Sequence, residues 1–192
     1  MKAVAALLSS LAIAGGVHAA DDKLRSGTFE PPRMAPELSL RGSDGTELKL
    51  ERYRGKVVVL GFGFSHCPEV CPTTLAKLAK ARKGLGPLAS DLQVVYVTVD
   101  PERDDPATMR AYLANFDPTF VGGTGTAAQI GQVEKDYGIV ATRYEGGRPG
   151  VYGFEHSSFV YLIDREGRLR AMVPYGKSAD DIVHDAGILL KR

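Results

Sequence analysis

Hydrophobic residues fill most of residues 56–63 (KVVVLGFG), which predicts a strand buried on both faces and central in a sheet. Residues 74–85 place apolar side chains at helical spacing and are followed by Gly86, as expected of an amphipathic helix that ends there. Residues 92–99 (LQVVYVTV) predict another strand. A strand, a helix and a strand in this order predict a βαβ unit whose two strands are parallel.

The other elements follow from alternation, capping signals and helical spacing. Apolar and polar residues alternate on both sides of a turn at residues 42–45, which predicts a β-hairpin over residues 37–50. Asp105 and Pro106 form a helix start, because aspartate caps well and proline is favoured at the first helical position. The remaining expectations, in chain order, are a helix to about residue 116, a short strand at 120–121, a helix at 127–137, an exposed glycine-rich loop at 143–153, a hairpin over 158–173 and a terminal helix capped by Ser178.

The first residues have the pattern of an export signal. Lys2 precedes an apolar run from Ala3 to Val17, and small residues follow, so we expect residues 1–19 to be a signal peptide cleaved near Ala19 or Ala20. A retained anchor facing the periplasm is the alternative. The expected compartment is a bacterial periplasm, where disulfides can form.

The bulk composition is typical of a soluble globular protein. Of the 192 residues, 44% are hydrophobic and 24% are charged, and the formal net charge is +1. This charge gives no indication of nucleic-acid binding. We expect a proline-containing tether at residues 20–36, one domain at residues 37–192, and no stable membrane insertion of the mature chain.

Both cysteines, Cys67 and Cys71, lie where the strand at 56–63 ends and a helix begins. On a helix, residues four apart share a face, with Cα atoms roughly 6 Å apart. The helix start would offer Cys67 free N–H groups and the positive end of the dipole, which favour a thiolate. A structural disulfide is disfavoured, because closing a loop of three residues removes little chain entropy.

The order of elements predicts an α/β thioredoxin-like fold, with a central mixed sheet flanked by helices and an N-terminal β-hairpin. In that fold the segment before the late hairpin approaches the cysteines, and here this segment contains His156. Two thiolates and one imidazole make a poor structural zinc site but suit Cu(I), and can also hold Cu(II). Cys67, Cys71 and His156 are therefore candidate ligands for a soft metal ion such as copper.

Two other histidines are weaker candidates. His66 is adjacent to Cys67 and is expected to tune the thiol rather than to bind metal, and His184 is expected to be exposed on the terminal helix. The charged residues of the segment 100–104 (DPERD) follow a strand end, a common place for function, although a capped charged loop explains them almost as well.

Three stretches resemble the Sco/SenC family of copper proteins: residues 61–72 (GFGFSHCPEVCP), residues 97–104 (VTVDPERD) and residues 154–157 (FEHS). The resemblance runs from about Pro36 to the terminal helix. It implies a thioredoxin-like protein that delivers copper to the binuclear copper site of cytochrome c oxidase, reduces the cysteines of that site, or does both. It also implies that Cys67, Cys71 and His156 bind the copper.

The resemblance implies as partners the copper subunit of cytochrome c oxidase or another copper client, with a thiol reductase or a second copper chaperone as further ones. The chain departs from the family at Glu69 and Glu155, where aspartate is common, and at His66. These changes leave the implied ligands intact but could shift copper affinity or redox potential.

The main alternative to a copper chaperone is an enzyme. A thiol-disulfide oxidoreductase would use Cys67 as nucleophile and Cys71 to resolve, but such enzymes usually have two residues between their cysteines, not three. They also usually carry a proline where this chain has His156. A peroxidase of the peroxiredoxin type is disfavoured, because Phe64 stands where a threonine is expected.

Overall fold

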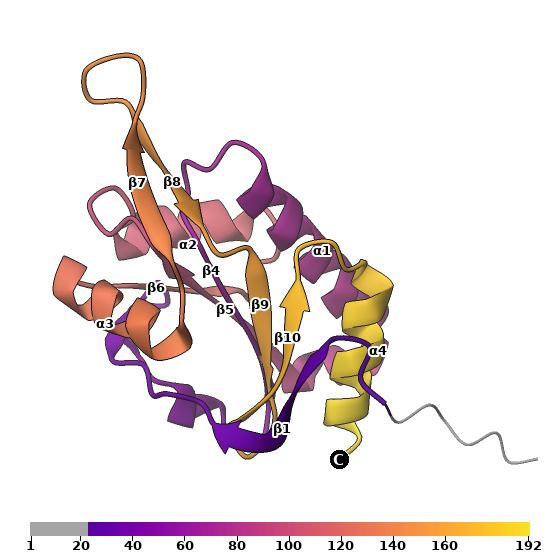
Figure 1. Cartoon of the computed structure of the whole chain (residues 1–192). Coiled ribbons are helices and arrows are strands. Elements are labelled where there is room, and N and C mark those ends of the chain that lie inside the picture. The colour runs from indigo at the N-terminus through magenta and orange to yellow at the C-terminus, as the bar shows by residue number, and fades with distance from the viewer. Residues whose placement is uncertain (1–22) are drawn as a thin grey trace, which may run out of the picture.

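The computed structural model describes residues 23–192 and forms an eight-stranded mixed sheet in the order β1-β10-β9-β4-β5-β6-β2-β3 (Figure 1). The strands are β1 (Gly27–Met34), β2 (Leu40–Gly42), β3 (Glu47–Leu48), β4 (Val57–Gly63), β5 (Leu92–Thr98), β6 (Val121–Thr124), β9 (Phe159–Ile163) and β10 (Arg168–Pro174). The helices are α1 (Val70–Gly84), α2 (Pro106–Ala114), α3 (Ala127–Tyr137) and α4 (Ala179–Leu190). Two short 3₁₀ helices are η1 (Leu50–Tyr53) and η2 (Gly86–Asp91).

Strand β4 lies at the centre of the sheet, as its composition predicted, and every residue of it is buried. It pairs in parallel with β5 across the α1 crossover, which confirms the βαβ unit. It pairs antiparallel with β9 on its other side. The predicted α/β class, with a central mixed sheet flanked by helices, is confirmed.

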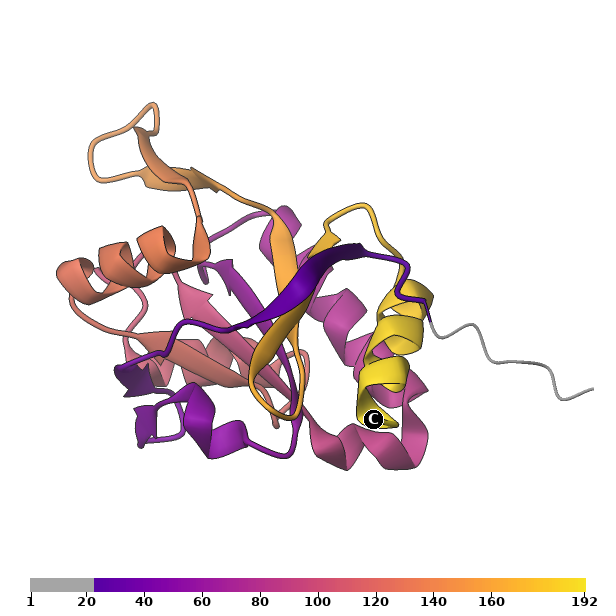
Figure 2. The same ribbon diagram turned by 60° about the horizontal axis from the view of Figure 1, so that its bottom comes forward.

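The helices cover both faces of the sheet. Gly63 of β4 lies against Cys71 of α1, whereas the ring of Phe62 lies 5.6 Å from that of Tyr137 in α3. Because neighbouring residues of a strand point to opposite faces, α1 and α3 lie on opposite sides of the sheet. Helix α4 packs beside α1, as both views show (Figures 1 and 2).

Local capping signals fix the helix ends where they were predicted. The Asp105 side chain accepts the Thr108 N–H at 2.7 Å at the start of α2. Capping boxes built on Thr126 and Ser178 start α3 and α4. The predicted N-terminal hairpin is present but short: β2 pairs antiparallel with β3, and η1 follows.

The expectation of a tether over residues 20–36 is wrong for residues 27–34. These form β1, an edge strand that pairs antiparallel with β10. Pro31 and Pro32 are accommodated because the register shifts between Thr28 and Arg33, and an edge strand needs hydrogen bonds on one side only. The predicted signal peptide, residues 1–19, lies outside the described residues.

The expectation of a loop over residues 143–153 is also wrong at both ends. Strands β7 (Ala141–Glu145) and β8 (Tyr152–His156) form an antiparallel hairpin that is a separate two-stranded sheet. It projects from the body of the molecule in both views (Figures 1 and 2). Its strands were missed because most side chains of β7 are exposed, so no apolar alternation marks them.

Within residues 23–192, every helix is too short or too polar to cross a lipid bilayer.

Candidate functional site

Cys67 lies in the loop between β4 and α1, and Cys71 lies in the first turn of α1. The backbone N–H of Cys71 points at the Cys67 sulfur, with a nitrogen–sulfur distance of 3.4 Å. Glu69, the N-cap residue, makes no side-chain capping bond, so the sulfur takes up one of the free N–H groups at this helix end. The Cys67 sulfur thus lies at the N-terminal end of the α1 dipole, where the sequence placed it. Both cysteines are free thiols.

Cys71 is buried, with 1% of its surface exposed. Its pKa is raised to about 12, first by burial and then by the hydrogen bond with Cys67, against hydrogen bonds from the Phe64 backbone and the Tyr96 hydroxyl, which act to lower it. Cys71 is therefore a protonated thiol at neutral pH in the metal-free chain.

Two glycines of β4 make room for this thiol and for Tyr96. A Cβ at Gly63 would collide with the Tyr96 hydroxyl and would lie 2.7 Å from the Cys71 sulfur. A Cβ at Gly61 would lie 2.8 Å from the Tyr96 ring. Sequence reasoning missed Tyr96 as a site residue. The available signal was the pair of glycines inside a buried strand, which indicates that another group approaches the backbone closely.

His156 ends β8, and its Nε2 lies 3.4 Å from the Cys71 sulfur. Its Nδ1 lies 2.9 Å from the Ser157 carbonyl oxygen, which can only accept, so Nδ1 carries the proton and Nε2 presents its lone pair to the sulfur. Burial lowers the pKa of His156, against the opposing effect of the Ser157 bond. The imidazole is thus neutral at neutral pH.

The structure separates the other two histidines from this group. His66 is exposed, and its Nδ1 lies 2.9 Å from the Ser65 hydroxyl. His184 lies on α4 and pairs with the buried Asp185 at 3.0 Å, so it is less exposed than its helix position suggested.

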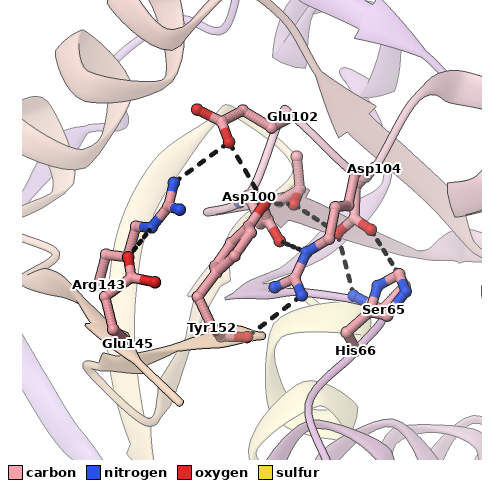
Figure 3. A network of polar contacts seen from close by, with 10 residues as sticks. Ser65, His66, Asp100, Glu102, Asp104, Arg143, Glu145 and Tyr152 are labelled. Atoms are coloured by element: carbon pink, nitrogen blue, oxygen red, sulfur yellow. Dashed lines mark hydrogen bonds and ion pairs between the residues drawn. The ribbon is translucent and has the colours of Figure 1, made fainter. Parts of the chain in front are cut away.

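The charged segment at 100–104 contacts Ser65, two residues before Cys67 (Figure 3). Asp104 is fully buried and accepts the Ser65 N–H at 3.0 Å and the Thr98 hydroxyl at 2.6 Å. Asp100, also buried, pairs with Arg103. A solvated surface loop would leave its carboxylates exposed. Here Asp104 instead joins the start of the cysteine loop at Ser65 to the end of β5 at Thr98.

The site combines three donors that can act on one soft ion or on one disulfide. Cys71 and His156 are in contact, and the Cys67 sulfur faces the same helix turn. No three His, Cys, Asp or Glu side chains of residues 23–192 already surround a common metal position. Coordination by all three predicted residues would therefore need a side-chain adjustment, and their role as ligands stays a prediction.

A mixed sheet flanked by helices, with two thiols at a helix start and an imidazole against the second thiol, defines a thioredoxin-like domain with a dithiol–imidazole site. The SCO1/SenC family profile matches residues 27–190. The chain belongs to the SCO1/SenC family.

Relatives that match the sequence agree with this assignment. The SCO2-like protein RP587 of Rickettsia prowazekii is 34% identical over 158 residues, which cover 81% of this chain and 73% of the relative. The mitochondrial protein SCO1 of Saccharomyces cerevisiae is 35% identical over 145 residues, which cover 73% of this chain and 48% of the relative.

Solved structures show the same fold. Bradyrhizobium japonicum ScoI with copper bound superposes with a TM-score of 0.75 at 31% identity, covering 81% of this chain and 99% of ScoI. Yeast Sco1 with copper bound gives a TM-score of 0.75 at 31% identity, covering 83% of this chain and 90% of Sco1. BsSco, at 23% identity, a TM-score of 0.66, and coverage of 83% and 94%, supports the fold; it is described as a member of the Sco family of cytochrome c oxidase assembly proteins.

Proposed function

We propose that this chain binds one copper ion through Cys67, Cys71 and His156 and passes it to the copper subunit of cytochrome c oxidase. The observation that carries the proposal is the 3.4 Å contact between His156 Nε2 and the Cys71 sulfur. It directs the lone pair of a neutral imidazole at a thiol, with a second thiol one helical turn away. Two sulfurs and one imidazole nitrogen suit both Cu(I) and Cu(II).

Copper takes the place of a proton in this arrangement. The Cys71 thiol loses its proton when the metal binds, so uptake releases protons to solvent. The Ser157 carbonyl keeps Nδ1 protonated and holds the ring orientation, which leaves Nε2 free to bind the metal. Cys67 is the more exposed sulfur and is the first that an incoming client thiol would meet during ligand exchange.

The relatives support the copper half of the proposal more directly than the delivery half. Two of the solved relatives named above hold copper, and BsSco is described within a family of oxidase assembly proteins. The choice of the cytochrome c oxidase copper subunit as client, rather than another copper protein, is part of our proposal.

We propose the periplasm as the compartment, with residues 1–19 removed near Ala19 or Ala20. The support is the sequence pattern of Lys2, the apolar run and the small residues after it. N-terminal sequencing of the protein from fractionated cells tests this. An N-terminus near residue 20 in the periplasmic fraction is expected, whereas an intact Met1 in the membrane fraction would indicate an anchored protein.

A second candidate function is thiol-disulfide exchange, favoured by the N–H that faces the Cys67 sulfur. The Cys67 thiolate would attack a client disulfide, forming a mixed disulfide and releasing one client thiolate. Cys71 would then give its proton to His156 Nε2 and attack the Cys67 sulfur, which breaks the mixed disulfide and releases the second client thiolate. The chain ends as the Cys67–Cys71 disulfide, the client ends as a dithiol, and a separate thiol reductase would restore the chain.

Copper titration of the reduced protein separates the two functions. Wild type is expected to bind one Cu(I) or one Cu(II) per chain, and Cys67→Ser and Cys71→Ser are expected to lose Cu(II) and most Cu(I) affinity. The oxidised protein is expected to bind neither ion, because a disulfide offers no thiolate. A wild type that binds neither ion but reduces disulfides would overturn the copper proposal in favour of the exchange function.

A further inference from the structure

The two halves of the site come from parts of the molecule that are not hydrogen-bonded to each other as one sheet. The cysteines follow β4 of the main sheet, whereas His156 ends β8 of the separate hairpin. The chain itself links the two halves, because Phe159, three residues after His156, begins β9, which pairs with β4. Contacts outside the two sheets then orient the hairpin that carries His156. Two ring contacts, of Phe64 with Phe154 and with His156, contribute on the apolar side.

The loop at residues 100–104 holds the cysteine half through Asp104. This buried carboxylate accepts both the backbone N–H and the hydroxyl of Ser65, two residues before Cys67. It also accepts the Thr98 hydroxyl at the end of β5. The start of the cysteine loop is thus tied to the neighbouring strand.

The same loop holds the histidine half through Arg103 and Tyr152. The Arg103 guanidinium carbon lies 3.7 Å from the centre of the Tyr152 ring, and its Nη1 donates to the Tyr152 carbonyl oxygen at 3.2 Å. The Tyr152 hydroxyl donates to Asp100 at 3.1 Å. Arg143 of β7, seen beside Tyr152 in Figure 3, also lies 3.7 Å from the ring centre, so two guanidinium groups contact this ring.

We propose that Arg103 and Tyr152 are positioning residues that set His156 against the two cysteines, and that they thereby determine the affinity of the site for Cu(II). This inference rests on the proposed copper function. Tyr152 lies four residues before His156 on the same strand, and Ser65 lies two residues before Cys67. One short loop therefore contacts both chain segments immediately before the proposed ligands.

Arginine suits this position for a physical reason. Its Nε pairs with Asp100 at 2.5 Å, and its plane stacks on Tyr152 while Nη1 reaches the backbone. Its Nη2 is buried without a hydrogen-bond partner among residues 23–192. One N–H group of the guanidinium thus stays unpaired while the planar group stacks on Tyr152. A lysine ammonium is not planar and cannot reproduce this stacking.

Arg103→Lys tests the proposal, and Arg82→Lys is its matched control. Arg82 also pairs with an aspartate, and the side chains of Arg82 and Arg103 are 22% and 23% exposed. Arg103→Lys is expected to lose roughly 10-fold or more in Cu(II) affinity, the range for residues that orient a metal ligand, with a shifted thiolate-to-copper absorption band. Cu(I), which two sulfurs can satisfy, is expected to lose much less. Equal loss of both ions, or no difference from Arg82→Lys, would contradict the proposal.

Two variants of Tyr152 distinguish the contribution of its ring from that of its hydroxyl. Tyr152→Phe keeps the stacked ring and is expected to cost less Cu(II) affinity than Tyr152→Ala. In a His156→Ala background, Tyr152→Ala is expected to have little further effect on Cu(II), since the ligand that it positions is absent. Additive losses in the double variant would show a general structural role instead.

A metal-free measurement separates failure of this inference from failure of the copper function. Arg103→Lys is expected to speed amide hydrogen exchange in residues 141–156 and to shift the His156 ring signals in NMR spectra, whereas Arg82→Lys changes neither. If wild type binds no copper while these changes appear, the copper function fails and the positioning stands. If the exchange and ring signals match wild type, the positioning is overturned whatever the copper result.

Discussion

The two regions that form the candidate site differ in how their residues are held. The cysteines belong to β4 and the first turn of α1, at the centre of an eight-stranded sheet. His156 belongs to a two-stranded hairpin whose outer positions, such as Tyr144 and Val151, are exposed. The core thus fixes one half of the site, whereas the other half is held by its short connection to β9 and by a few polar and ring contacts. His156, the ligand expected to matter more for Cu(II) than for Cu(I), lies on the hairpin, which is the less supported of the two regions.

Removal of the imidazole is expected to have the largest effect on this comparison. His156→Ala should lower Cu(II) affinity by roughly 100-fold, which is the upper limit for residues that only orient a metal ligand. Cu(I) affinity should fall much less, because two sulfurs can satisfy this ion. Disulfide formation between Cys67 and Cys71 should persist. Copper titration with visible absorption spectra measures both ions, and His184→Ala is the control. A variant that keeps wild-type Cu(II) affinity and spectrum would show that His156 is not a ligand.

A glycine substitution perturbs the core-supported half instead. Gly63→Ala places a methyl group against the Cys71 sulfur and the Tyr96 hydroxyl, so the free energy of unfolding should fall by about 1–3 kcal/mol. Gly131→Ala is the matched control, because a Cβ there meets nothing within 4 Å and a helix interior gains up to about 1 kcal/mol from alanine. Urea unfolding of both variants checks the opposite signs. Stabilisation by both substitutions would contradict the packing described for Gly63.

Alkaline pH should destabilise the reduced metal-free protein through Cys71. Its pKa in the folded chain, about 12, lies above the ordinary value of 9.0. The folded state therefore holds the proton more tightly, and the resulting stability is complete below pH 9 and is lost as the pH rises toward 12. The slope for one such group is about 1.4 kcal/mol per pH unit. Denaturant unfolding between roughly pH 8.5 and 10.5, a range that begins near the ordinary thiol pKa, should show a steeper fall in the free energy of unfolding for wild type than for Cys71→Ser. Parallel slopes would mean that Cys71 is not buried as a thiol.

The smallest effect is expected from a single hydroxyl in the core-supported half. Tyr96→Phe removes the hydrogen bond that lowers the Cys71 pKa, so the copper-bound thiolate should lose about 1 kcal/mol, or several-fold in affinity for both ions. Tyr175→Phe, at a partly exposed tyrosine that contacts Lys77, is the control. Isothermal titration with each ion measures the change. A loss of affinity for Cu(II) alone would contradict this account, because it would mean that Tyr96 acts through His156 rather than through Cys71.

The same contrast explains what could be predicted from the sequence. The βαβ unit and the capped helices were predictable, because buried runs, helical spacing and residues such as Asp105 act locally. Strands β1 and β7 were not, because β1 contains Pro31 and Pro32 and β7 is mostly exposed; both depend on partners distant in the sequence. Tertiary contacts override weak local signals in such segments.

The site was predictable to a similar extent. Cys67 and Cys71 share one motif, and the predicted thioredoxin-like fold was enough to predict that His156 lies near them. The contact of Tyr96 with Cys71 depends on the register that pairs it with Gly61, and the stacking of Arg103 on Tyr152 joins residues 49 positions apart. Neither register nor stacking leaves a periodic pattern in the sequence.

The central claim is that Cys67, Cys71 and His156 bind one copper ion together. X-ray absorption spectroscopy of the Cu(II)-loaded protein, with His156→Ala beside it, tests this most directly. The expected result is two sulfur donors and at least one imidazole nitrogen around each copper in wild type, with the imidazole signal lost in the variant and both sulfurs retained. A wild-type spectrum that lacks sulfur donors, or an imidazole signal unchanged in His156→Ala, would contradict the claim.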